Sequence, residues 1–247
     1  MNTEQHHQSI IPYLFTACII FLGGYTELYS IKANGIFCAM QTGNLLNLFM
    51  HLIDEDFNQA LLSLIVLLVF LGGCFLAEVY RLHFPGRYRN YYKASVLLFQ
   101  IVFIIPTLFI PTKLSGFVNE GVINFSNVLQ DSFLALYGSF HFISFREEEG
   151  HSFTPTMMTN MMKNITVHLA ACTKENKKEH AVMALRYFLL VLSFILGAVT
   201  FYLLYRTLKA NDMMQYVSYL PGLVIIGNLL LVPFSIYSDR KEQKENH

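Results

Sequence analysis

Long apolar runs alternate with short polar segments along almost the whole of the 247-residue chain. A helix needs about 20 apolar residues to cross a hydrocarbon core of about 30 Å, and six runs reach this length. They extend from Ile11 to Ile31, Gln59 to Tyr80, Ala94 to Leu114, Val122 to Phe145, Ala181 to Tyr205 and Val217 to Tyr237. The pattern therefore predicts an all-α integral membrane protein with six transmembrane helices.

Two further apolar segments, Gly35 to Ile53 and Phe153 to Cys172, would raise the count to eight if they also spanned. Cytoplasmic loops are enriched in Lys and Arg, so the basic residues distinguish the two counts. With six helices and both termini inside, 13 of the 17 basic residues lie on the inner side; with eight, those outside the segments divide 8 against 8. We therefore interpret both segments as re-entrant or interfacial and predict that both termini are cytoplasmic.

The order of helix, polar-motif segment, helix and helix occurs twice in a single membrane domain, 1–247, with short polar termini. The first half covers about 10–115 and the second about 121–238. Thr42 in MQTGNLLNLF is matched by Thr159 in MMTNMMKNIT, and LGG at 71–73 resembles LGA at 196–198. Because three spans is an odd number, the second half enters the membrane upside down. This predicts a 3+3 inverted repeat, an arrangement that recurs in transporters.

The stretch GGYTELYSI followed by FCAMQTGNLLNL resembles the YoaK-like family of bacterial multi-pass membrane proteins, whose function is unknown. The similarity extends over nearly the whole chain, and Thr42, Gly43 and Asn44 are its most specific part. It implies a bacterial inner-membrane location but no activity. The chain departs from the family pattern at Glu27, where another acid is usual, and in the second motif, which has become Thr159, Asn160 and Met161.

Glu27 is the first candidate for a residue on a substrate or ion pathway. An ionisable group within a spanning helix is costly and usually faces a cavity or a partner, which makes proton coupling a hypothesis for this carboxyl group. The alternative is a side chain that reaches the nearby outer surface.

The first motif segment contributes Gln41, Thr42, Gly43 and Asn44. Gln41 and Asn44 share one helical face with Asn47 and His51, at spacings of three, three and four. Gly43 permits a break or a close backbone approach, and amides at a break can bind an ion or a polar solute. The alternative is that these amides only hold helices together.

The second half contributes Asp131 and His141 in the fourth helix, and Thr159, Asn160 and Lys163 in the second motif segment. Asp131 and His141 belong to one polar stripe but are separated by roughly 15 Å along the helix, too far for direct contact. Lys163 is suited to an anionic solute, or to a lipid phosphate group.

Composition excludes several classes of function. Hydrophobic residues make up 54% of the chain and charged residues 14%, and the formal net charge is zero with no basic stripe, so we expect no nucleic-acid partner. HExxH, G-x-S-x-G and P-loop motifs are missing from the sequence, so we predict no enzymatic activity, cofactor or metal. The expected partners are the lipid bilayer and an unknown small solute, and assembly as a homo-oligomer stays open.

The sequence favours a small secondary transporter or permease for a polar or anionic solute. The alternative is a non-transporting membrane module that binds lipid or scaffolds a membrane partner. The inference of transport rests on an analogy of architecture.

Overall fold

A computed structural model describes residues 10–111, 125–145, 147–148, 151–152, 158–174 and 177–245 of the chain. The regular elements of the described residues are helices apart from β1 (Glu147–Glu148) and β2 (His151–Ser152), which form a short antiparallel pair. The ends of the third and fourth apolar runs lie outside the described residues, and so does the boundary between the predicted halves.

Each predicted apolar run contains a helix. The six are α1 (Ile10–Asn34), α3 (Phe57–His83), α4 (Tyr92–Thr107), α5 (Phe125–Ser144), α7 (Lys177–Ala210) and α8 (Gly222–Glu245). The 3-10 helices η1 (Gly86–Tyr91) and η3 (Met214–Tyr219) precede α4 and α8. Four segments are long and apolar enough to cross a membrane: Pro12–Asn34, Phe57–His83, Lys177–Ala210 and Met214–Asp239. The chain is thus compatible with a membrane protein.

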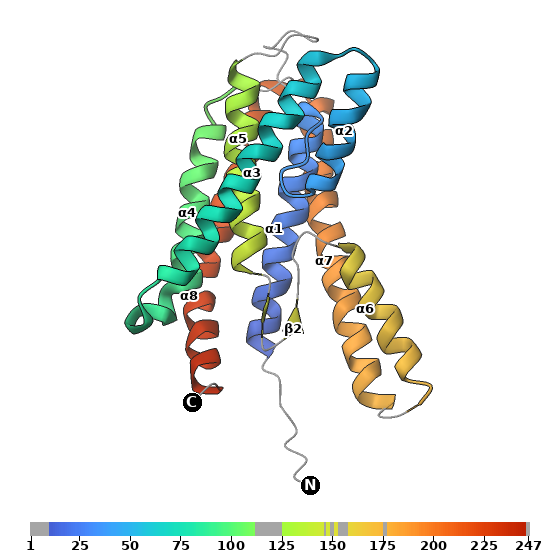
Figure 1. Cartoon of the computed structure of the whole chain (residues 1–247), viewed down its shortest axis with the longest axis vertical. Helices are drawn as coiled ribbons and strands as arrows, with labels where there is room; N and C mark the ends of the chain where they lie inside the picture. Colours follow the sequence, from blue (N-terminus) through green and yellow to red (C-terminus); the bar gives the residue numbers. More distant parts are fainter. Residues whose placement is uncertain are drawn as a thin grey trace.

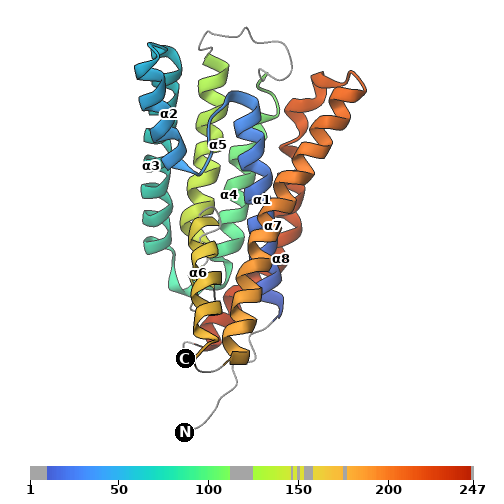
Figure 2. The ribbon, with the colours of Figure 1, turned by 90° about the vertical axis from the view of Figure 1, so that its right-hand side faces the viewer.

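The two motif segments form short helices, α2 (Gln41–Ile53) and α6 (Met158–Ala171), with 13 and 14 residues. At 1.5 Å per residue each is roughly 20 Å long, less than the thickness of a hydrocarbon core. In Figure 1, α2 occupies the upper part of the bundle and α6 the lower part, and Figure 2 shows the same placement after a quarter turn. The two motif helices therefore lie toward opposite ends of the molecule.

The direction of each helix follows from the colour gradient in Figure 1. Helices α1, α4 and α7 run away from the end of the bundle at which α1 begins and α8 ends, which we call the terminal end, whereas α3, α5 and α8 run toward it. The turn between α6 and α7 also lies at the terminal end (Figure 2). The first helix of each half, α1 or α5, therefore runs in the opposite direction to its counterpart.

Large apolar side chains cover the outer surface, while polar side chains are buried inside together with the apolar core clusters. The exposed surface of α3 and α7 carries large apolar side chains such as Leu68, Phe75, Leu185 and Phe188. The interior, by contrast, contains Glu27, Asn44, Lys93, Gln100, Asn127, Gln130, Asp131, His141, Asn228 and Asp239, all at most 5% exposed. A lipid environment favours this distribution, because apolar side chains can face lipid without cost. Ionisable side chains are costly to expose to lipid and are therefore buried inside the bundle.

Glycines allow α1 and α7 to approach each other closely. A Cβ at Gly24 would overlap the carbonyl oxygen of Phe194, and a Cβ at Gly197 would overlap that of Phe21. Around this contact, Phe201 makes edge-to-face ring contacts with Tyr25 and Tyr29, at centroid distances of 5.6 and 5.7 Å. Small residues at such crossings let helix backbones meet, which is the main source of helix association within lipid.

Gly197→Ala is expected to lower the free energy of unfolding by about 1–3 kcal/mol, the usual cost of overpacking. For a chain of this size this corresponds to a fall in Tm of roughly 3–10 °C. Gly72→Ala is the matched control, because a Cβ at Gly72 meets nothing within 4 Å. Thermal unfolding in detergent, followed by far-UV circular dichroism, measures both. Equal Tm values for the two variants would contradict the close α1–α7 contact.

Candidate functional site

The first polar motif begins where α1 stops and the chain folds back on it. Gly35 has a φ of 77°, the left-handed conformation that commonly ends helices at glycine. The Ser30 hydroxyl then donates a hydrogen bond of 2.7 Å to the carbonyl of Ile36, which holds the returning chain against α1. Residues 35–40, which we call the break, separate α1 from α2.

Glu27 binds this break from α1. Its Oε2 accepts hydrogen bonds from the backbone N–H of Ala39, at 3.1 Å, and from the Cys38 thiol, at 3.0 Å. Its Oε1 accepts from the N–H of Met40, at 3.3 Å. The carboxyl group is 2% exposed and satisfies donors that the irregular backbone leaves without helical partners. Glu27 therefore points into the bundle.

Asn44 closes the break from the other side. Its Oδ1 accepts the backbone N–H of Phe37 at 2.9 Å, while its Nδ2 donates to the Phe37 carbonyl at 2.7 Å and to Gln41 Oε1 at 2.9 Å. Gln41 Nε2 also donates to the carbonyls of Phe37 and Cys38. A Cβ at Gly43 would lie 2.5 Å from Cε2 of Phe37, so this glycine makes room for the ring. Thr42 is exposed.

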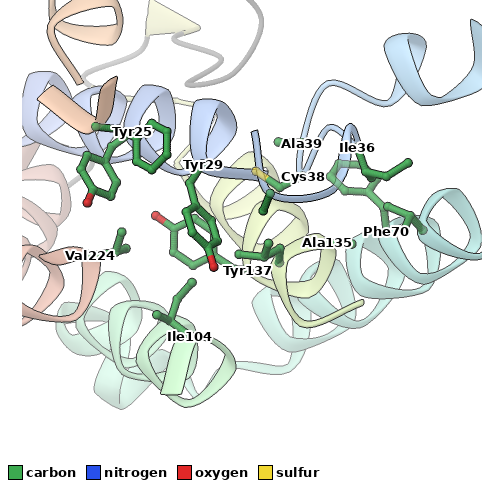
Figure 3. Close-up of a cluster of buried hydrophobic side chains, with 14 of the residues drawn as sticks. Tyr25, Tyr29, Ile36, Cys38, Ala39, Phe70, Ile104, Ala135, Tyr137 and Val224 are labelled. Carbon is green, nitrogen blue, oxygen red and sulfur yellow. The ribbon is translucent and has the colours of Figure 1, made fainter. Parts of the chain in front are cut away.

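The break lies against α5. Gly138 contacts the carbonyl of Cys38, and a Cβ there would come within 2.5 Å of that oxygen. Figure 3 shows Cys38, Ala39 and Ile36 from the break together with Ala135 and Tyr137 from α5 and Phe70 from α3. Apolar packing thus encloses the Glu27 carboxylate and the backbone groups that it binds.

A second polar cluster joins the end of α1 to α5. Asn34 Nδ2 donates to Asp131 Oδ1 at 2.8 Å and to Gln130 Oε1 at 3.0 Å. Gln130 Nε2 in turn donates to the Tyr29 hydroxyl at 2.8 Å. Asp131 is therefore buried in an amide network on the side of the bundle away from the terminal end.

A third cluster surrounds His141 in the middle of the bundle. Nε2 of Gln100 in α4 lies 3.3 Å from His141 Nδ1, and Oε1 of Gln100 accepts a 3.2 Å hydrogen bond from Asn228 Nδ2 in α8. The imidazole stacks on Tyr137, with ring centroids 5.4 Å apart. Gln100 therefore links His141 of α5 to Asn228 of α8.

A fourth cluster lies near the terminal end of α4 and α8. Lys93 Nζ is 3.8 Å from Asp239 Oδ1 and donates to Ser238 Oγ at 3.0 Å, and the Lys93 backbone N–H donates to Asp239 Oδ2 at 2.9 Å. Both charged side chains are at most 5% exposed. This buried ion pair connects residues that lie 146 positions apart in the sequence.

Comparison with known proteins identifies the family. The family model of DUF1275, described as a protein of unknown function, matches residues 15–227. The chain belongs to the DUF1275 family. No curated protein matches the chain, and no solved structure does. The resemblance seen in the sequence is consistent with this family, whose description supplies no activity.

Within this DUF1275 member, the second motif lies apart from the interior clusters. Thr159 and Lys163 are exposed and Asn160 is half-buried on α6. The buried residue of this helix is Met161, which packs with Ile20 and Met183. The structure therefore brings Glu27, Gln41 and Asn44 together, places Asp131 and His141 in two other clusters, and leaves the second-motif candidates at the α6 surface.

Sequence reasoning missed five polar residues of the interior: Asn34, Lys93, Gln100, Asn228 and Asp239. A signal was available for Gln100 and Asn228, since each is an amide within an otherwise apolar run. Amides placed in this way usually face the inside of a bundle. The partners of these amides could not be found, because Gln100 and Asn228 are separated by 128 residues.

Proposed function

We propose that this protein is a small secondary transporter or permease of the bacterial inner membrane, acting on a polar or anionic solute. The observation that carries the proposal is a succession of buried polar clusters through the bundle. Asp131 lies away from the terminal end, Glu27 and His141 lie deeper, and Lys93 lies near the terminal end, in the order that the helix directions give (Figure 1). Ionisable groups inside a membrane bundle usually mark ion or substrate pathways.

We infer an inverted repeat of six spanning helices from the pattern of helix contacts. Among the described residues, exchanging α1 with α5, α2 with α6, α3 with α7 and α4 with α8 leaves the set of well-packed α-helix pairs unchanged, although the contacts of η1 and η3 differ. Thus α1 packs on α7 as α5 packs on α3, α2 on α3 as α6 on α7, and α4 on α5 as α8 on α1. Transporters built in this way bind their solutes where the two repeats meet.

Close packing repeats as well. Gly73 in α3 contacts Ser139 of α5, and Gly197 in α7 contacts the backbone of Phe21 and Tyr25 in α1. The motif helices also fit an inverted relation between the halves, since α2 and α6 lie toward opposite ends of the bundle (Figure 2). We infer that α2 and α6 are re-entrant, and that the basic loops place the terminal end and both termini in the cytoplasm.

A ligand screen tests the proposal. The purified protein is heated in detergent with amino acids, organic acids, nucleobases, sugars and inorganic ions, one at a time. A solute at about 100 times its Kd should stabilise the fold by about 2.7 kcal/mol, a rise in Tm of roughly 5–10 °C. The rise should be lost in Glu27→Gln, and the same solute should enter proteoliposomes that contain the wild type. A hit that proteoliposomes exclude would contradict transport.

The alternative is a non-transporting module that binds lipid or scaffolds a membrane partner. One observation favours it: the side-chain amides of Gln41 and Asn44 bind within the break itself. Under this alternative, Asn44→Ala would lower the free energy of unfolding, and any cellular phenotype would weaken in proportion to that loss. Under the transporter proposal, Glu27→Gln abolishes the coupling of uptake to pH while the protein stays folded.

A further inference from the structure

Arg186 lies outside the interior polar clusters, in the third turn of α7, a helix that begins at the terminal end (Figure 1). Its Cζ is 5.8 Å from the ring centroid of Tyr13, which belongs to the first turn of α1. The Tyr13 hydroxyl in turn donates a hydrogen bond of 3.0 Å to the Arg186 carbonyl. Both side chains are half-buried. Arg186 therefore lies at the level of the bundle where α1 begins.

The charge of Arg186 has no counter-charge in the part of the chain that the structure describes. Arg81 and Lys93 each form an ion pair with a carboxylate, whereas Arg186 pairs with no described acidic side chain. The Tyr13 ring attracts the guanidinium through its face, but a ring face does not accept the five N–H groups as an anion does. The Arg186 side chain is therefore suited to an anion from outside the protein.

The surface of α7 around Arg186 is apolar. Val182 and Leu189 are neighbours of Arg186 on one side of the helix and are exposed. Met183 and Leu190 are its neighbours on the other side and are buried. Arg186 therefore lies at the border between the protein interior and a helix face that lipid covers. From such a position a long side chain extends its charge to the membrane interface, where the anions are lipid phosphates.

We propose that Arg186 and Tyr13 form a binding site for an anionic phospholipid. The planar guanidinium donates two parallel N–H bonds to the lipid phosphate, and the Tyr13 ring holds it in place. The exposed Val182 and Leu189 side chains contact the acyl chains, which favours a lipid over a free phosphate ion. With the terminal end in the cytoplasm, the lipid belongs to the inner leaflet. The site rests on the membrane location in the proposed function and is independent of transport.

Native mass spectrometry of the full-length protein in an uncharged detergent measures the binding of added phosphatidylglycerol. We expect Arg186→Gln to weaken the tightest binding by at least about fivefold, the factor that corresponds to about 1 kcal/mol for one basic residue at an anionic membrane surface. Arg186→Lys keeps the charge without the planar fork and should recover part of the affinity. Arg206→Gln is the matched control and should bind as the wild type does, because Arg206 is exposed near the opposite end of the same helix.

Two further ligands identify what the site recognises. Phosphatidylcholine has the same phosphate but no net charge and should bind the wild type more weakly, and inorganic phosphate should not displace phosphatidylglycerol. The proposal is overturned if the Arg186→Gln variant, shown to be folded by far-UV circular dichroism, binds phosphatidylglycerol as tightly as Arg206→Gln. It is also overturned if phosphatidylcholine binds equally well, or if inorganic phosphate displaces the lipid and so assigns Arg186 to a free anion. Lipid binding without any transport would contradict the proposed function alone.

Discussion

Lys93→Met is expected to lower the free energy of unfolding by about 3–5 kcal/mol, the usual effect of breaking a buried ion pair. The substitution removes the cation 3.8 Å from Asp239 Oδ1 and leaves a carboxylate that is 5% exposed. Removing the charge of Lys93 raises the cost of burying the carboxylate, while Met fills nearly the same volume as Lys and creates little cavity. Titration with SDS in mixed micelles, followed by far-UV circular dichroism, measures the change.

The double variant Lys93→Met/Asp239→Asn separates charge from packing. Asn at 239 keeps an oxygen that accepts the backbone N–H of Lys93, as Asp239 Oδ2 does at 2.9 Å, but carries no charge. We expect it to recover most of the lost stability, since a buried ion pair replaced by neutral groups is often close to neutral in effect. If the double variant is less stable than Lys93→Met, the ion pair does not explain the loss.

The helices could be predicted from the sequence because a bilayer sets a minimum length for an apolar run. For example, the run from Gln59 to Tyr80 became α3, Phe57–His83, extended by Asp56, whose side chain accepts the N–H of Gln59. Gly43 was expected to permit a break or a close backbone approach; the break lies at residues 35–40 instead, and Gly43 lies within α2, where it makes room for the Phe37 ring. The length and the ends of a helix are determined by residues that lie close together in the sequence.

Partners across the bundle could not be predicted. Asp131 was a candidate because a carboxyl group in an apolar helix is costly, but Asn34, its partner, lies 97 residues away. Lys93 and Asp239 each resemble an ordinary charge at the end of a helix until the fold places them together. A linear pattern shows that a polar group needs a partner and does not show which one.

The two motif helices show the same limit. Gln41 and Asn44 lie on the face of α2 that turns toward the protein, while Leu45 and Leu46 are exposed. In α6 the polar Thr159 and Lys163 are exposed. The two helices differ because α6 buries Met161 in an apolar cluster with α1 and α7, whereas α2 uses Asn44 to bind the Phe37 backbone. The two helices therefore have a similar spacing of polar residues, but these residues face the protein in α2 and are exposed in α6.

Glu27→Ala is expected to lower the free energy of unfolding by about 2–4 kcal/mol and to release the break from α1. The substitution leaves the N–H groups of Ala39 and Met40 without their acceptor, and a buried donor without a partner costs about 1–3 kcal/mol. Glu27→Gln keeps one acceptor oxygen and should cost clearly less. SDS titration in mixed micelles gives both values.

Glu78→Ala is the matched control for Glu27→Ala, because it removes a glutamate from a helix of the same bundle. The Glu78 side chain is 33% exposed and pairs with Arg81 one turn away, at 2.6 Å, so its loss should cost less than about 1 kcal/mol. An equal loss in the two variants would show that Glu27 does not hold the break. A large loss in Glu27→Ala beside a stable, transport-deficient Glu27→Gln would instead assign two roles to one carboxyl group: its oxygens hold the break, and its charge couples transport.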